Sequence, residues 1–267
     1  MLMAAHRSKA CACIMTIVLC ATVVACSHRA TTSELPAPPP TVGASTSGSA
    51  APAGIDWKVL GSSVQGRPIR SLTLGHGSRK VLLVGGIHGD EREGAYATAQ
   101  LPAAFAAANL AGGVTLTIIE DVNPDGRAAA QRGNANGVDI NRNFPASNFD
   151  THEPSYGGTP LSQPESRVLF DVIDRIDPAL VLVFHSWVDK QFVNFDGPAL
   201  AIAERFSIES GISLTPSSEF SPTPGSLGSY VGRDRRTPVL TIEFLRGSDP
   251  KANWERVRSA VLNAIAG

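Results

Sequence analysis

Four apolar segments constrain the fold of this chain more than any other feature of its sequence. Each is long enough for a buried strand and is bounded by glycine, proline or polar residues. The segments are KVLLVGGI (80–87), VTLTIIEDV (114–122), ALVLVFHSW (179–187) and PVLTIEFL (238–245). They predict the central strands of one buried sheet.

Helical patterns separate these segments and follow the last of them. They lie at about 91–108, 163–177, 199–210 and 253–266. Strands that alternate with helices predict an α/β domain whose functional site lies at the carboxyl ends of the strands. The earlier stretch WKVLGSSVQGRPIRSLTLG, residues 57–75, predicts a hairpin added at a sheet edge. We therefore expect one catalytic domain over residues 55–267.

The N-terminus predicts an exported protein. Residues 1–25 contain Arg7 and Lys9 and then the apolar run CACIMTIVLCATVVA, which is short for a membrane span. The run ends in VVAC, which resembles the lipobox of bacterial lipoproteins, where the cysteine is acylated and becomes the mature N-terminus. We expect cleavage before Cys26 and a lipid anchor on it, facing outside the cytoplasm; the alternative is an uncleaved hydrophobic helix.

Residues 26–54 predict a tether between the lipidated cysteine and the domain. Ala, Pro, Ser, Thr and Gly dominate this stretch, which has too little apolar bulk to offset chain entropy. The chain has four cysteines, all at or before Cys26, so the domain has no thiol for a disulfide, a thiolate ligand or a nucleophile. The net charge is -1, and the sequence has no cluster of basic residues that would indicate nucleic-acid binding.

Two histidines and a glutamate predict a metal site. His88 follows the first strand, Glu91 comes three residues later where a helix should begin, and this spacing can aim both side chains at one point. His185 closes the strand at 179–187. Zinc in hydrolytic enzymes takes such a set and leaves a fourth position for water. The alternative for each histidine alone is a hydrogen-bonded core or turn residue.

Glu243 is the candidate general base. It lies inside the apolar strand PVLTIEFL, where an unpaired charge would be costly. Thr241 and Glu243 share one face of this strand by its period of two, so the glutamate can project from the strand towards a water molecule at the metal. The alternative is a structural ion pair with an arginine.

The loop NPDGRAAAQRGNANGVDINRNFP, residues 123–145, offers groups for substrate binding. Arg142 beside the amide of Asn141 could bind a free carboxyl terminus, because a guanidinium can donate two parallel hydrogen bonds to a carboxylate. Arg132 suits the oxyanion that forms when water adds to a carbonyl. The alternative for both arginines is a surface salt bridge.

The motifs HGDE, NPDG, GVDINRNFP, FHSW, TPGSLGSY and TIEF follow one another between residues 80 and 245. In this order they resemble the carboxypeptidase A-like zinc carboxypeptidases. Within that family the chain is most similar to the small bacterial branch that includes murein peptide amidases, which cleave γ-D-glutamyl-diaminopimelate bonds in wall peptides.

The resemblance implies a mixed, twisted sheet of about eight strands with helices on both faces, and one zinc ion per chain. It also implies hydrolysis of a C-terminal amide bond in a peptide with a free carboxylate. The implied roles are zinc ligand for His88, Glu91 and His185, general base for Glu243, oxyanion group for Arg132, and carboxylate clamp for Asn141 with Arg142.

Two departures from the family pattern bear on substrate choice. Digestive members place a tyrosine on a mobile loop before the catalytic strand, where this chain has SEFSPTPGSLGSY, and neither Phe220 nor Tyr230 is assigned that role. Asp90 stands where those enzymes carry an arginine. Its charge favours a cationic substrate such as a diaminopimelate peptide; the alternative is a cap for the helix that begins near Glu91.

Two other functions compete with a carboxypeptidase or peptide amidase that acts on wall peptides. One is a deacylase resembling aspartoacylase or succinylglutamate desuccinylase, which the GVDINRNFP loop and the export signal disfavour. The other is an inactive relative that serves as a wall-binding lipoprotein, which would require a lost ligand or base. Every such position is filled.

The lipid anchor is tested by the variant Cys26→Ala. We expect the native protein to partition into detergent and the variant to be soluble or unprocessed, because the predicted acylation site is gone. Detergent phase separation followed by mass determination measures both properties. Equal partitioning of the processed native and variant forms would contradict the lipoprotein prediction.

Overall fold

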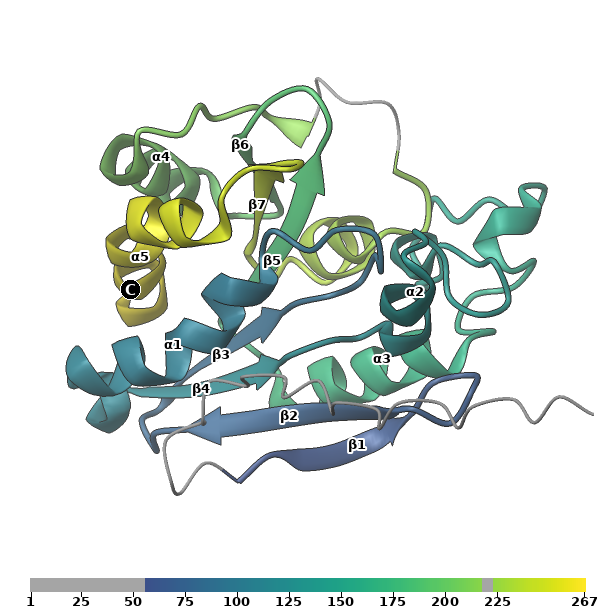
Figure 1. Ribbon diagram of the computed structural model, residues 1–267, viewed down its shortest axis with the longest axis horizontal. Coiled ribbons are helices and arrows are strands. Elements are labelled where there is room, and N and C mark those ends of the chain that lie inside the picture. The colour runs from purple at the N-terminus through teal and green to yellow at the C-terminus, as the bar shows by residue number, and fades with distance from the viewer. Residues whose placement is uncertain (1–55, 218–222) are drawn as a thin grey trace, which may run out of the picture. The chain divides into compact units, whose positions relative to one another are not determined.

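The computed structural model describes residues 56–217 and 223–267 (Figure 1). These residues belong to a unit that extends over Ala50–Gly267. The predicted export signal, Cys26 and the tether up to residue 54 lie outside the described residues, and so they stay predictions. Among the helices of the two described ranges, none is both long enough and apolar enough to span a membrane.

A mixed sheet of seven strands forms the centre of the domain, in the order β1-β2-β4-β3-β5-β7-β6. Strands β4, β3, β5 and β7 run parallel to one another, whereas β1, β2 and β6 pair antiparallel with their neighbours. This confirms the mixed α/β fold, with seven strands in the described residues where the resemblance implied about eight. The strands are β1 (Lys58–Ser62), β2 (Pro68–Leu74), β3 (Arg79–Val84), β4 (Val114–Ile119), β5 (Leu180–Trp187), β6 (Phe192–Asp196) and β7 (Val239–Leu245).

Helices cover both faces of the sheet, because successive side chains of each central strand point to opposite faces. Val81 and Leu83 pack in one apolar cluster with α1, α4 and α5, and Leu82 and Val84 pack in a second cluster with α3 and η5. Figure 1 shows α4 and α5 side by side and α3 beside the β1–β2 hairpin. The helices are α1 (Ala95–Ala107), α2 (Pro124–Ala129), α3 (Pro164–Ile176), α4 (Leu200–Ser210), α5 (Pro250–Ala266) and the π-helix η5 (Gly228–Asp234). Short 3-10 helices are η1 (Leu110–Gly112), η2 (Ile140–Arg142) and η3 (Pro154–Tyr156).

Every predicted strand and helix is present in the structure, but helix α2, which lies in the predicted loop at 123–145, and one strand were not predicted. The four apolar segments are β3, β4, β5 and β7, the stretch at 57–75 is the β1–β2 hairpin, and the four helical patterns are α1, α3, α4 and α5. Strand β6 was not predicted. It is an edge strand of five residues (FVNFD), and its antiparallel pairing with β7 establishes it.

The order of the strands creates the crevice that holds the candidate site. From β3 the chain passes to β4 on one side and then to β5 on the other. The segments that leave the carboxyl ends of β3 and β5 therefore diverge and leave a crevice between them. Open α/β sheets bind ligands in such a crevice. His88 follows β3, His185 lies near the end of β5, and Glu243 pairs in register with His185 on the adjacent strand β7.

The loop after β3 rests directly on α2. Asn123 caps α2 by accepting a hydrogen bond from the backbone N–H of Gly126, and its amide donates to the carbonyls of Ile87 and Arg132. A Cβ atom at Gly89 would overlap the backbone of Gly126 and its neighbour. Only a glycine lets the two segments approach this closely, so the loop that carries His88 depends on it.

The variant Gly89→Ala tests this close approach. We expect it to lower the free energy of unfolding by about 1–3 kcal/mol, because one segment has to move away from the other, and to weaken metal binding in the same protein. The control is Gly112→Ala, since a Cβ there meets nothing within 4 Å. Thermal unfolding and metal content measure the two effects. Equal behaviour of the two variants would mean that the loop relaxes without cost.

Candidate active site

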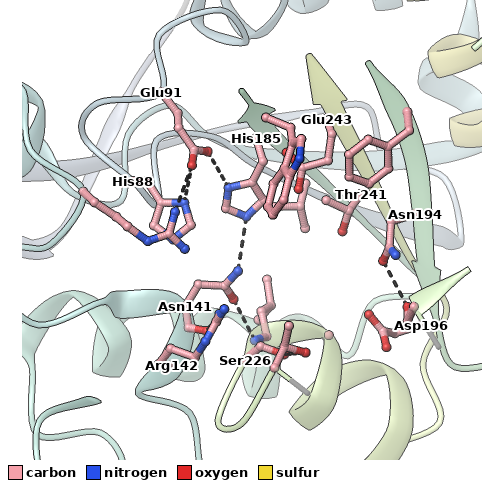
Figure 2. Close-up of a pocket in the computed structure, with 18 residues that line it drawn as sticks. His88, Glu91, Asn141, Arg142, His185, Asn194, Asp196, Ser226, Thr241 and Glu243 are labelled. Atoms are coloured by element: carbon pink, nitrogen blue, oxygen red, sulfur yellow. Dashed lines mark hydrogen bonds and ion pairs between the residues drawn. The ribbon is translucent and has the colours of Figure 1, made fainter. Parts of the chain in front are cut away.

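A cavity of about 410 Å³ opens at the carboxyl ends of the central strands. Side chains from β5, β6 and β7, from the loop at 123–145 and from the segment before η5 line it (Figure 2). The predicted zinc ligands, the predicted general base, the predicted oxyanion group and the predicted carboxylate clamp all line this one cavity. They are His88, Glu91, Arg132, Asn141, Arg142, His185 and Glu243.

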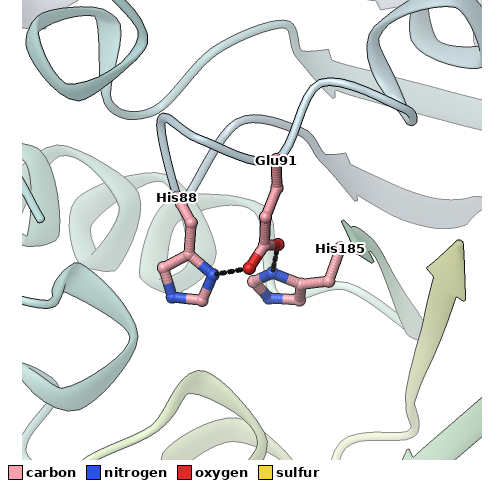
Figure 3. A group of neighbouring side chains, drawn as sticks. All are labelled: His88, Glu91 and His185. Carbon is pink, nitrogen blue, oxygen red and sulfur yellow. Dashed lines mark hydrogen bonds and ion pairs between the residues drawn. The ribbon is translucent and has the colours of Figure 1, made fainter. Parts of the chain in front are cut away.

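The carboxylate of Glu91 joins the two histidines, as Figure 3 shows. Nδ1 of His88 lies 2.8 Å from one carboxylate oxygen, and Nδ1 of His185 lies 2.8 Å from the other. All three side chains are buried, and their ligand atoms lie within 4.8 Å of one another. Two imidazole nitrogens and one carboxylate are the donors of many hydrolytic zinc sites, so this group fits the implied metal.

The outer nitrogens of both imidazoles also have neighbours. Nε2 of His88 lies 3.1 Å from a carboxylate oxygen of Asp139, and Nε2 of His185 lies 3.3 Å from the side-chain amide of Asn141. The carboxylate of Asp139 orients the ring of His88 and raises its basicity. The amide N–H of Asn141 donates to Nε2 of His185 and orients that ring, because the oxygen of the same amide accepts from Leu227. Both rings are therefore held with Nδ1 towards Glu91.

Electrostatics keep Glu91 in the form that binds a cation. Burial alone would raise its pKa, but His185 and His88 hold the pKa of Glu91 far below its ordinary value. Burial alone would lower the pKa of His88, but the carboxylates of Glu91 and Asp139 raise it above the ordinary value. Glu91 also accepts a hydrogen bond from the backbone N–H of Ser186 at 3.0 Å, which fixes the carboxylate against β5.

Glu243 lies beside the histidines with one carboxylate oxygen unpaired. It projects into the cavity on the same face of β7 as Thr241. Its Oε2 is buried and has no hydrogen-bond partner, and no arginine in the described ranges lies within ion-pair distance of it. Burial is the main reason that the pKa of Glu243 is raised. A buried, unpaired and more basic carboxylate is suited to accept a proton.

The two arginines of the loop differ in their partners. Arg132 donates to Asp139 at 2.9 Å and to Glu91 at 3.2 Å, with 44% of its side chain exposed at the cavity. Arg142 donates to the carbonyl of Asn141 at 2.8 Å and lies over the ring of Tyr156. Across the described residues no carboxylate pairs with Arg142, so its charge is available to an anionic ligand.

Asp139 is a site residue that the sequence reasoning did not identify. It bridges His88 and Arg132 through its two carboxylate oxygens, and it caps η2 by accepting from the backbone N–H of Asn141. Burial would raise its pKa, but His88 and the nearby arginines hold the pKa of Asp139 well below its ordinary value. A carboxylate between the apolar residues Val138 and Ile140 of GVDINRNFP was the available signal.

Asp90 lies outside the lining of the cavity. Its carboxylate accepts a hydrogen bond from Arg246 at 3.0 Å. Helix α1 begins at Ala95 after Gly94 and has no side-chain cap, so the alternative role of Asp90 as a helix cap was wrong. The acidic residue that lines the cavity away from the histidines is Asp196, which the sequence reasoning also missed because it lies on β6.

Of the two aromatic residues considered for the mobile-loop tyrosine, the structure describes Tyr230 alone. Phe220 lies outside the described residues. Tyr230 stacks on Phe144 and Phe170 in the second apolar cluster and does not line the cavity.

This site and this fold together define a metal-dependent hydrolase, because a His–Glu–His group faces a free carboxylate at the carboxyl edge of an α/β sheet. Residues 49–199 match the sequence model of the family described as zinc carboxypeptidase, and the chain belongs to that family. The match contains every predicted metal ligand, whereas Glu243 lies beyond it. The protein is therefore a peptide hydrolase of the zinc carboxypeptidase family.

Relatives within the family act on amide bonds of peptides, as their names state. Murein peptide amidase A of Escherichia coli (strain K12) is 31% identical over 231 residues, which cover 77% of this chain and 87% of that protein. Gamma-D-glutamyl-L-diamino acid endopeptidase 1 of Lysinibacillus sphaericus is 27% identical over 253 residues, which cover 72% of this chain and 61% of that protein. These relatives support a peptide amidase function.

Solved structures agree with the fold. The murein-tripeptide amidase of Escherichia coli O157 superposes with a TM-score of 0.63 at 27% identity, covering 79% of this chain and 92% of that one. Thrombin activatable fibrinolysis inhibitor superposes with a TM-score of 0.67 at 18% identity, covering 79% of this chain and 67% of that one, and so it supports the fold alone.

The metal content of variants tests which site residues are zinc ligands and which residue is the general base. We expect His88→Ala and His185→Ala to lose tight zinc binding, because three protein ligands are the set that such a site provides. Glu243→Gln should bind zinc as the native protein does, since it removes no ligand. Elemental analysis after dialysis measures the content, and circular dichroism controls for folding. A Glu243→Gln protein as poor in zinc as the histidine variants would show that Glu243 is a ligand.

Proposed function

We propose that this protein is a zinc-dependent peptide amidase that hydrolyses the γ-D-glutamyl-diaminopimelate bond in murein peptides. The observation that carries the proposal is the unpaired Oε2 of Glu243, buried in the same cavity as the converging His88, Glu91 and His185. The names of the relatives, a murein peptide amidase and a γ-D-glutamyl-L-diamino acid endopeptidase, support this substrate class.

His88, Glu91 and His185 would hold the zinc ion. When bound, zinc supplies Lewis acidity to the amide carbonyl and makes water more acidic. Glu243 accepts a proton from the attacking water as the new C–O bond forms, and it passes this proton to the amine as the C–N bond breaks. The raised pKa of Glu243 favours the first transfer, because a more basic carboxylate holds the proton until the amine takes it.

Arg132 is placed to stabilise the charge that develops on the carbonyl oxygen. Asp139 and Glu91 hold its guanidinium from one side, and almost half of the side chain remains exposed at the cavity. Because these contacts fix the guanidinium before the reaction, little reorganisation is needed when charge appears.

Asn141 and Arg142 form the proposed clamp for the carboxylate of the released residue. The carbonyl oxygen of the Asn141 side chain accepts from the backbone N–H of Leu227 at 2.9 Å, which turns the amide group towards His185 and the cavity. The guanidinium of Arg142, free of any carboxylate partner in the described structure, supplies the positive charge. A clamp of this kind fixes the position of the amide bond relative to Glu243.

We also propose that the protein works outside the cytoplasm as a lipoprotein. Residues 1–25 read as an export signal, Cys26 as the lipidated residue and residues 26–54 as the tether. A murein substrate supports this location, because wall peptides lie outside the cytoplasmic membrane.

The proposed reaction is tested with L-Ala-γ-D-Glu-meso-diaminopimelate and the purified, zinc-loaded protein. We expect release of diaminopimelate, and a loss of roughly 10²–10⁴-fold in kcat for Glu243→Gln, because this variant lacks the general base. Mass spectrometry identifies the products. Ordinary C-terminal peptides and N-acyl amino acids are assayed in parallel. Cleavage of N-acyl amino acids alone would point to a deacylase, and no cleavage of any substrate by a zinc-loaded protein would point to an inactive wall-binding protein.

A further inference from the structure

Another cavity, of about 270 Å³, lies towards the edge of the sheet opposite the candidate active site. Lys80 and Thr115 are the second residues of the parallel strands β3 and β4, and Thr73 lies near the end of the antiparallel strand β2. The arrows of β3 and β4 in Figure 1 point away from this edge. The candidate active site lies at the carboxyl ends of the central strands, and the two cavities share no lining residue.

Hydroxyl groups and cations line this cavity. Alternate residues of β2 and of β4 share the face of the sheet that carries Leu82, which packs in the apolar cluster with α3. Beside these strands, the cavity is bounded by the last turn of α3. No described carboxylate belongs to the lining, which consists of one isoleucine and the polar residues Ser71, Thr73, Thr115, Thr117, Lys80 and Arg175.

The two cations of the cavity have no carboxylate partner. Lys80 and Arg175 are exposed, and neither forms an ion pair within the described residues. Asp174 and Asp177, which lie close to Arg175 in sequence, contact Arg235 at 3.6 Å and 3.9 Å instead. The end of α3 carries a partial negative charge of roughly half an elementary charge, which the full charge of Arg175 outweighs. The cavity therefore has a positive charge that no side chain of its lining neutralises.

Two hydroxyl groups are available to donate into the cavity. Ser71 is only 6% exposed, and its hydroxyl has no hydrogen-bond partner among the described residues. The Oγ1 atoms of Thr73 and Thr117 lie 3.3 Å apart, so one hydroxyl donates to the other and the second keeps its proton for a ligand. Thr115 donates to the carbonyl of Gly77 at 2.7 Å and is not available. An unpartnered buried hydroxyl costs free energy that a hydrogen bond to a ligand recovers.

We propose that this cavity binds a phosphate group. Lys80 and Arg175 supply the positive charge, and the guanidinium can donate two hydrogen bonds to phosphate oxygens. Ser71 and the threonine pair add neutral donors. These donors come from three strands and one helix, so they surround the cavity from several sides. A tetrahedral anion presents oxygens in all these directions, whereas a carboxylate presents two in one plane. The inference is independent of the proposed amidase function.

The place where the chain enters the domain indicates one source of the phosphate. The described residues begin at Asp56, directly before β1, and Lys58 of β1 pairs with Ser71 in the cavity lining. A tether that ends at residue 54 therefore joins the domain beside this cavity and not beside the active site. For a domain anchored in this way, the phosphate of a lipid headgroup is one source. Free inorganic phosphate is the other.

A titration with inorganic phosphate, followed by the NMR shifts of backbone amides, tests the inference. The amides of Ser71 and Thr117 report on this cavity separately from the zinc site and Arg142, which also attract anions. We expect saturable shifts in the native protein. The double variant Lys80→Met with Arg175→Met should raise the Kd by roughly 10–100-fold, because charge-assisted hydrogen bonds are lost. Both side chains are exposed, so the variant should fold.

The matched control is Arg205→Met with Arg258→Met. It removes the same charge from exposed positions on α4 and α5, which cover the other face of the sheet. Its Kd should stay within about twofold of the native value, because exposed charges this distant are screened by salt. Equal weakening in both double variants would mean general attraction between charges and would overturn the inference, as would the absence of saturable shifts at Ser71 and Thr117.

The variant Ser71→Ala tests whether the hydroxyls take part. We expect its Kd, read from the amide of Thr117, to rise roughly 3–10-fold, as expected for the loss of one neutral hydrogen bond. An unchanged Kd would overturn the part of the proposal that concerns Ser71. Hydrolysis of L-Ala-γ-D-Glu-meso-diaminopimelate by the Lys80→Met with Arg175→Met variant should equal that of the native protein. Failure of the phosphate site and failure of the amidase function are therefore distinguishable.

A second titration distinguishes the two sources of phosphate. The probe is glycerophosphoglycerol, which is the headgroup of phosphatidylglycerol without its acyl chains. Tighter binding of this phosphodiester than of inorganic phosphate would support the site and identify a lipid headgroup as its ligand. The reverse order would support the site and identify the free anion. Binding of both probes with the same Kd in the native protein and in the Lys80→Met with Arg175→Met variant would overturn the proposal.

Discussion

The carboxylate of Glu91 connects segments of the chain that are distant in sequence. It contacts His88 on its own loop, His185 and the backbone N–H of Ser186 on β5, and Arg132 in the loop at 123–145. A buried carboxylate is costly unless several groups compensate it, and breaking a buried ion pair costs about 3–5 kcal/mol. The contacts of Glu91 therefore also fix the positions of these loops relative to the sheet.

Much of this arrangement could be predicted from the sequence, because its signals are local. The apolar runs predicted strands β3, β4, β5 and β7. His88, His185 and Glu243 were recognised because they are polar residues at or near the ends of those runs. The family resemblance added the mixed strand directions and the roles of the loop residues. Where a residue type is rare in its setting, as a glutamate is inside a buried strand, the sequence alone is informative.

What could not be predicted depends on contacts between distant segments. Strand β6 has only five residues and is established by its pairing with β7, so the sequence did not distinguish it from a loop, and Asp196 was missed with it. Asp139 was missed because its partner His88 lies 51 residues away, and only the fold of the loop turns it towards Arg132, seven residues earlier. Asp90 was assigned to the substrate because its charge stands where the digestive members of the family carry an arginine, whereas its partner Arg246 is 156 residues away.

The pairing of β5 with β7 has a further consequence for how the site tolerates change. Glu243 reaches the cavity because it stands level with His185, while Ile242 and Phe244 on either side of it are buried in the core. The side chains of a strand alternate between its faces, so a slip of one residue would turn Glu243 into the apolar core and a core side chain into the cavity. Insertions or deletions of single residues near β7 would thus remove the base while every site residue remained present in the chain. An intact set of motifs is therefore a weaker criterion for activity in this fold than an intact spacing between Val239 and Glu243.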